Sequence, residues 1–269
     1  MAGPITLMDG ATGTRLWELA AAAGEGRAPV WTYNLTQPAL VRRVAEEYIA
    51  AGTKLLCANT FAANGAEVAR VPGMDAAEVV AAGVRIAKQA AEAAGDVRVA
   101  LDVGPLSALL VPFGSTEPEA ARALFAAQIS AGVAAGADCV FLETFTSVEM
   151  LSIAAREALR HGLPVLCSLS FDQRGRTMMG DSIDDIVESL EPLGVAALGI
   201  NCSFGPASAV PVIRAYAERT AMPLIVKPNA DCGPEEFADI LAPILPLVRY
   251  AGACCGSGPD YIKAIRARI

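Results

Sequence analysis

The chain has 269 residues, 54% hydrophobic side chains and a formal net charge of −8. This length suits one β/α barrel, which typically takes about 250 residues. An acidic chain without a dense Lys/Arg run argues against nucleic acid as a partner, because phosphate binding needs clustered cations. No stretch approaches the roughly 20 apolar residues of a membrane span, so we expect the apolar excess to form a core and no membrane association.

The N-terminus, MAGPITLMDG, has no basic region followed by an apolar segment. We therefore expect a cytoplasmic protein without a secretory signal. In a reducing compartment the seven cysteines are expected to be core thiols, metal ligands or nucleophiles instead of disulfides. The single histidine, His161, excludes a His-rich metal site, and we expect it at the surface near a helix end.

Short apolar runs bounded by turn residues recur about every 30 residues and alternate with alanine-rich amphipathic stretches. These runs predict strands at 5–9, 54–60, 97–104, 139–144, 164–170, 196–202, 223–229 and 250–255. The amphipathic stretches predict helices at 39–51, 75–94, 118–135, 148–161, 183–190, 207–219, 235–242 and 259–268. Near-continuous apolar strands separated by helices indicate a parallel sheet buried on both faces.

Eight such units in this length favour a closed, eight-stranded parallel β/α (TIM) barrel, with an open doubly wound sheet as the alternative. Because we find no linker or low-complexity tract, we predict one domain over residues 1–269. Catalytic groups of such barrels come from the carboxyl ends of the strands. The predicted ends carry Asp9, Asn59, Thr60, Asp102, Glu143, Thr144, Ser170, Asn201, Cys202, Asn229, Cys254 and Cys255. A rim rich in carboxylates, amides and thiols is typical of an active site.

The cysteines fall into two groups by position. Three lie inside apolar strands, where cysteine is usually a small core residue: Cys57, Cys139 and Cys167. Cys232, which follows a strand end, stays ambiguous. Cys202, Cys254 and Cys255 lie at the predicted rim, and the last two are adjacent between glycines.

Three thiols at one rim are the ligand set of a catalytic zinc ion, which keeps its fourth position for water or substrate. On spacing alone, a trio of ordinary buried thiols is an equal alternative, and the absence of a CxxC pair disfavours a structural four-cysteine site. Zinc deprotonates a bound thiol. A further thiol bound at such an electron-rich site would stay nucleophilic and suited to attack a methyl group on a good leaving group.

Six segments carry a resemblance to a known family: MDGATGT (8–14), ANTFAANG (58–65), FLET (141–144), GINCSFGP (199–206), KPNADCGP (227–234) and GACCGSGPDYI (252–262). With them the chain resembles the homocysteine S-methyltransferases, which include betaine–homocysteine methyltransferase and the N-terminal module of cobalamin-dependent methionine synthase. The resemblance covers nearly the whole chain. It implies a methyltransferase that activates homocysteine, or a related thiol, as a thiolate and makes methionine.

The resemblance also implies roles for individual residues. The family's zinc ligands match Cys202, Cys254 and Cys255. Its homocysteine-binding acidic residues match Asp9 and Glu143, whose carboxylates would pair with the substrate ammonium group. The alternatives are a turn residue before a glycine for Asp9 and a core salt bridge for Glu143.

Three further residues follow from the same resemblance. Thr60 and Asn201 are expected to shape the substrate pocket, and Asn229 is expected beside the metal when substrate is absent. The chain departs from the family's usual GGCCG and PNAG spellings at Ala253 and Asp231. These departures put the exact substrate in doubt more than the metal.

The methyl donor is the least determined feature. The GINCSFGP and KPNA spellings look closer to the cobalamin-dependent branch, and the chain has no DxHxxG corrinoid loop, so we predict a methylcorrinoid on a separate protein. The alternatives are a small donor of the betaine or S-methylmethionine type, a corrinoid-linked demethylase component acting on another substrate, and a non-catalytic zinc- or thiol-binding barrel. A small cationic donor would need an aromatic-lined pocket. The aromatic residues near the predicted rim are Trp17, Trp31, Tyr33, Phe61 and Phe204.

Overall fold

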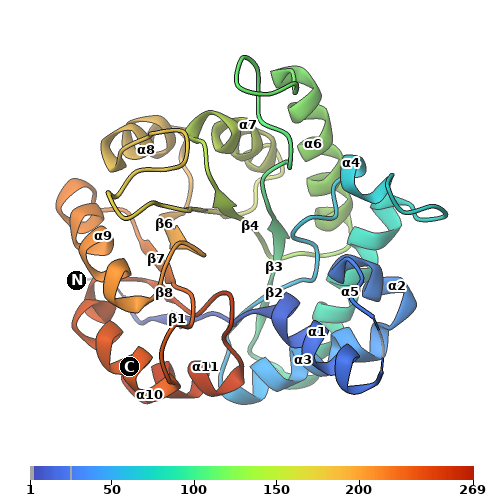
Figure 1. The fold of residues 1–269 in the computed structure, drawn as a ribbon, viewed down its shortest axis with the longest axis horizontal. Helices are drawn as coiled ribbons and strands as arrows, with labels where there is room; N and C mark the ends of the chain where they lie inside the picture. The colour runs from blue at the N-terminus through green and yellow to red at the C-terminus, as the bar shows by residue number, and fades with distance from the viewer. Residues whose placement is uncertain (1–2, 25) are drawn as a thin grey trace.

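The structure is a computed structural model that describes residues 3–24 and 26–269. Its eight parallel strands form a barrel surrounded by helices (Figure 1). Each strand from β2 to β7 pairs with the next in chain order, and β8 pairs with β1. A parallel bridge between Met8 and Leu55 joins the β1 and β2 edges and closes the ring. The prediction of a barrel instead of an open sheet is confirmed.

The strands are β1 (Thr6–Leu7), β2 (Leu55–Cys57), β3 (Arg98–Val103), β4 (Cys139–Phe145), β5 (Val165–Leu169), β6 (Ala197–Asn201), β7 (Leu224–Lys227) and β8 (Tyr250–Ala251). The α-helices in the described part of the chain are α1 (Thr12–Ala22), α2 (Tyr33–Thr36), α3 (Pro38–Ala51), α4 (Gly65–Val68), α5 (Ala76–Ala94), α6 (Pro118–Ala134), α7 (Val148–Leu159), α8 (Ile183–Leu190), α9 (Pro206–Arg219), α10 (Pro234–Leu241) and α11 (Pro259–Arg266). Short 3₁₀ helices lie at Val30–Thr32, Glu191–Leu193 and Ala242–Leu247. None of the helices in the described ranges has the length and apolar character needed to cross a bilayer.

The inward-facing side chains of the barrel form two layers, one apolar and one polar. Side chains of the inner apolar layer form a small buried cluster that includes Met8, Leu55, Ala100, Phe141, Leu166 and Ile225. Residues two positions further along a strand face the same interior. On β2, β3, β4, β5 and β7 those positions hold Cys57, Asp102, Glu143, Ser168 and Lys227, all buried. The polar layer therefore lies at the carboxyl ends of the strands, where barrel active sites are built.

Seven of the strands lie within the predicted ranges and are shorter than predicted, whereas β4 extends one residue beyond its predicted range, to Phe145. The prediction of 250–255 contains β8, for example, which pairs only over Tyr250–Ala251. The sequence analysis missed α1 altogether. Only Leu16 and Ala20 of α1 are buried, and the short helices α2 and α4 were missed as well.

We predict that Gly199→Ala destabilises the barrel by about 1–3 kcal/mol, the usual effect of overpacking. Gly199 in β6 is the register partner of Ile225 in β7. A Cβ atom at Gly199 would lie 2.1 Å from the Ile225 carbonyl oxygen, so the two strands must separate. Urea unfolding measures the loss.

The matched control for this substitution is Gly65→Ala at the start of α4. A Cβ atom there would lie 3.4 Å from a Leu124 methyl carbon, which is an ordinary contact. We expect a change within about 0.5 kcal/mol. Equal losses for the two variants would contradict the close approach of β6 and β7.

Candidate active site

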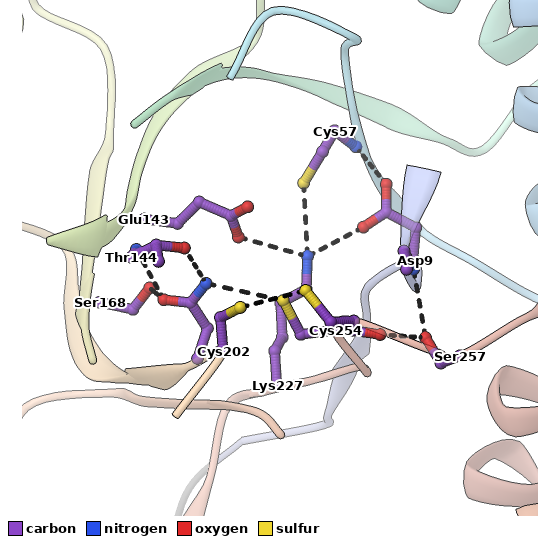
Figure 2. A network of polar contacts seen from close by, with 12 residues as sticks. Asp9, Cys57, Glu143, Thr144, Ser168, Cys202, Lys227, Cys254 and Ser257 are labelled. Atoms are coloured by element: carbon purple, nitrogen blue, oxygen red, sulfur yellow. Dashed lines mark hydrogen bonds and ion pairs between the residues drawn. The ribbon is translucent and has the colours of Figure 1, made fainter. Parts of the chain in front are cut away.

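The structure brings the predicted cysteine trio together. Cys202 follows β6, and Cys254 and Cys255 follow β8. Their three sulfur atoms all lie within 4.8 Å of one another, and the Sγ atoms of Cys202 and Cys255 are 3.2 Å apart (Figure 2). Within the described ranges, Cys232 is not part of this group.

Backbone contacts hold the trio in place. The Cys254 N–H donates to the Pro228 carbonyl oxygen at 2.8 Å, and the Ser257 hydroxyl donates to the Cys254 carbonyl oxygen at 2.7 Å. Cys202 has a positive φ of 47°, which is uncommon for a residue other than glycine. Such conformations persist only where the surroundings impose them, and they cluster at functional sites.

The trio fits a zinc ion with three protein ligands. Tetrahedral Zn–S bonds of roughly 2.3 Å place sulfurs about 3.8 Å apart, which agrees with a cluster inside 4.8 Å. Hydrogen bonding with the neighbouring thiols of Cys202 and then Cys254 lowers the pKa of the Cys255 thiol to about 3.

A buried lysine lies at the centre of the polar layer. Lys227, at the end of β7, is 2% exposed, and its Nζ lies 3.0 Å from Asp9 Oδ1 (Figure 2). The same Nζ is 3.7 Å from Glu143 Oε2 and 3.7 Å from Cys57 Sγ. Burial alone would lower the pKa of Lys227, but neighbouring acidic groups, Asp9 first, raise it above its ordinary value. The contact with Asp9 therefore favours the charged form of Lys227.

Asp9 is fully engaged inside the protein. Its Oδ1 accepts from Lys227, and its Oδ2 accepts from the Cys57 backbone N–H at 2.6 Å. The residue is 0% exposed. Asp9 is not among the residues that line the cavity described next.

Asp102 and Glu143, in contrast, line a cavity of about 310 Å³ together with Lys227 and the cysteine trio. Burial raises the pKa of Glu143 to about 7 against the opposing charge of Lys227. Burial, and then the charge of Glu143, also raises the pKa of Asp102. The ion pair between Glu143 and Lys227 at 3.7 Å is too long to count as a hydrogen bond.

The predicted pocket residues Thr60 and Asn201 make hydrogen bonds within the protein. Asn201 Oδ1 accepts from the Thr144 N–H at 2.7 Å and from the Ser168 hydroxyl at 2.6 Å. The Thr60 hydroxyl donates to the Asp102 carbonyl oxygen at 2.8 Å and accepts from the Asp102 N–H at 3.1 Å. Thr60 thus holds the end of β3, which carries Asp102. Asn201 holds the end of β4 through Thr144, the residue after Glu143.

The remaining predicted residues divide between the cavity and other places. Of the aromatic residues, Trp17 and Phe61 line the cavity. Trp31 and Tyr33 are buried in the core, and Phe204 lines a separate groove. The side-chain oxygen of Asn229 is buried without a hydrogen-bond partner among the described residues.

Sequence reasoning missed Lys227. The available signal was a cation that ends an otherwise apolar strand, two positions after the inward-facing Ile225.

Comparison with known proteins agrees with the resemblance seen in the sequence. The family model described as homocysteine S-methyltransferase matches residues 6–269. The chain is 27% identical over 301 residues to methionine synthase of Mycobacterium leprae, covering 100% of this chain but 24% of that protein. It is 27% identical to betaine–homocysteine S-methyltransferase 1 of Rattus norvegicus, covering 91% of this chain and 68% of that protein. The chain thus spans about a quarter of the length of the methionine synthase.

Among solved structures, the metallated form of the homocysteine methyltransferase MmuM from Escherichia coli superposes with a TM-score of 0.85. The two are 27% identical, and the alignment covers 99% of this chain and 97% of that one.

We predict that Lys227→Met destabilises the protein by about 3–5 kcal/mol, because it leaves the Asp9 charge buried without a partner. The double variant Asp9→Asn/Lys227→Met removes both charges and should lose much less. Urea unfolding of both variants measures the difference. Equal losses in the single and double variants would show that the pair is not what holds these strand ends.

Proposed function

The chain belongs to the homocysteine S-methyltransferase family, and on that premise we propose that it methylates the thiol of homocysteine to give methionine. One observation carries the proposal: a single cavity contains a three-thiol cluster and two buried carboxylates, Asp102 and Glu143. Homocysteine has a thiol at one end and an ammonium group at the other. The thiol cluster and the carboxylates of the cavity therefore suit the two ends of this acceptor.

We propose that Cys202, Cys254 and Cys255 hold zinc, as their sulfur spacing supports. When bound, zinc would lower the pKa of the acceptor thiol, so that a nucleophilic thiolate exists at neutral pH. The buried amide oxygen of Asn229 supports its proposed place near the metal in the absence of substrate, because that oxygen has no other partner among the described residues.

We assign the carboxylates different tasks. Glu143 faces the cavity and accepts the acceptor ammonium group, whereas Asp9 fixes Lys227. Lys227 in turn offsets part of the negative charge around the thiolates. Thr60 lines the cavity and also holds the end of β3, whereas Asn201 acts indirectly, by holding the end of β4.

The cavity favours a small cationic methyl donor over the methylcorrinoid predicted from the sequence. A corrinoid is too large for about 310 Å³ and would have to act from outside the mouth. Trp17 and Phe61 line the cavity, and aromatic faces stabilise ammonium and sulfonium groups. The Arg27 guanidinium lies over the Trp17 ring, 4.5 Å from the ring centre. The Trp17 indole N–H donates a hydrogen bond to the Ala28 carbonyl oxygen.

A methylcorrinoid donor on a separate protein is the second candidate. Two of the exposed large hydrophobic residues, Phe113 and Met178, lie on the loops that follow β3 and β5. These loops border the mouth, where a corrinoid carrier would have to dock.

Protein purified without chelator should contain about one equivalent of zinc, because a catalytic site with three protein ligands binds one ion. Serine at Cys202, Cys254 or Cys255 should each lower zinc content, measured by elemental analysis. Cys232→Ser is the matched control and should retain zinc. Zinc content that survives all three single substitutions would exclude the trio as ligands.

Zinc-loaded protein should form more methionine from S-methylmethionine or betaine than from methylcobalamin. Trp17→Leu should lower kcat/KM for the small donor roughly two- to thirtyfold, the range of a cation–π contact, while the KM for homocysteine stays near its original value. The assay follows methionine by chromatography. Turnover with methylcobalamin alone would instead support the corrinoid donor, and the absence of transfer to homocysteine from any donor would leave the demethylase or the non-catalytic barrel.

A further inference from the structure

Asn201 uses every hydrogen-bonding group of its side chain inside the protein. The residue ends β6 and is 0% exposed. Its Oδ1 accepts from the Thr144 backbone N–H at 2.7 Å and from the Ser168 hydroxyl at 2.6 Å. Its Nδ2 donates to the Thr144 hydroxyl oxygen at 2.6 Å and to Cys254 Sγ at 3.9 Å. An asparagine side chain has two acceptor lone pairs and two N–H donors, so the sulfur takes the last of the four places.

The neighbours of this amide fix which of its ends faces the sulfur. A backbone N–H can only donate, so Oδ1 must face the Thr144 N–H and the nitrogen must face Cys254. Thr144, Ser168 and Cys254 belong to one polar network with it (Figure 2). Without the sulfur, one N–H of a fully buried amide would have no partner, which native proteins rarely allow. Three shorter hydrogen bonds therefore direct this N–H to Cys254.

Backbone strain gathers around the same side chain. Thr144, with a φ of 63°, and Cys202, with a φ of 47°, are the two residues other than glycine with positive φ in the described ranges. Asn201 forms two hydrogen bonds with Thr144, and Cys202 is the next residue in the chain. Positive φ is a genuine outlier for a β-branched residue such as threonine. Strain of this kind persists only where the surroundings impose it, and it points to a function for the residue between the two.

We infer that Asn201 is a positioning residue of the metal centre, because its side-chain N–H donates to the Cys254 sulfur and fixes that ligand. The inference rests on the proposed function, since a hydrogen bond to a metal-bound thiolate is charge-assisted and stronger than one to a thiol. Hydrogen bonds of this kind orient metal ligands and tune the metal. The N–H also draws negative charge from the sulfur, which makes Cys254 a weaker nucleophile than a thiolate without a hydrogen bond.

Two substitutions separate this role from support of the fold. Asn201→Asp keeps the size of the side chain and an oxygen for Thr144 and Ser168, but it replaces Nδ2 with an oxygen that cannot donate to Cys254. Ser168→Ala is the matched control. Ser168 is also 0% exposed, and its hydroxyl contacts the amide oxygen instead of the nitrogen that faces the sulfur.

The test uses protein in which cobalt(II) replaces zinc, because the thiolate-to-cobalt charge-transfer bands report the charge on the sulfur ligands. In Asn201→Asp these bands should move to longer wavelength, since a thiolate without a hydrogen bond gives up an electron more easily. Ser168→Ala should keep the wild-type bands. The same shift in both variants, or bands that do not move in Asn201→Asp, would overturn the inference.

A second measurement uses the wild-type protein loaded with cadmium-113 and needs no variant to fold. One side-chain amide proton of Asn201 should show a scalar coupling to the metal nucleus, transmitted through the N–H···S bond. A cadmium-loaded protein without this coupling would overturn the inference. Coupling in a protein whose zinc-loaded form transfers no methyl group to homocysteine would overturn the proposed function and leave the role of Asn201 standing. Wild-type protein that binds none of these metals would overturn both.

Discussion

The buried ion pair between Lys227 and Asp9 is the contact on which the carboxyl end of this barrel depends. Lys227 ends β7, Asp9 follows β1, and Asp9 also accepts from the Cys57 N–H at the end of β2. The Asp9 carbonyl oxygen accepts from the Ala253 N–H, which ties in the loop that carries two of the three clustered cysteines. A buried pair is stable only while both partners remain, because either charge alone would be desolvated without compensation. The loop of the thiol cluster and the wall of the cavity are therefore both attached to one buried charge pair.

Much of the fold follows from the sequence, and the reasons are physical. Apolar strands such as β4 and β6 are buried on both faces, so their composition alone distinguishes them from half-exposed strands. Strand limits are harder to predict, because hydrogen-bonded pairing ends near the polar residues at the carboxyl ends of the strands. The missed α1 buries only Leu16 and Ala20, so it contributes little to the core from which the other helices were predicted.

The site was predictable in part. The cysteine trio could be predicted because thiols at strand ends must meet at one rim, and the structure brings them within 4.8 Å. The partner of each carboxylate could not be predicted. Three carboxylates lie at strand ends: Asp9, Asp102 and Glu143. Which of them pairs with Lys227 depends on the distances between their side chains in the folded protein. That choice separates a carboxylate paired inside the protein from two that line the cavity, and no spacing in the sequence predicts it.

The central claim is that one cavity binds the thiol of the acceptor at the cysteine trio and its amino group at the carboxylates of β3 and β4. A crystal structure of the zinc-loaded protein with L-homocysteine tests this claim most directly. The account predicts the homocysteine sulfur beside the metal held by Cys202, Cys254 and Cys255, and its nitrogen within hydrogen-bond distance of Asp102 and Glu143. A sulfur remote from the cysteines, or a nitrogen bound to Asp9 in place of Lys227, would contradict it.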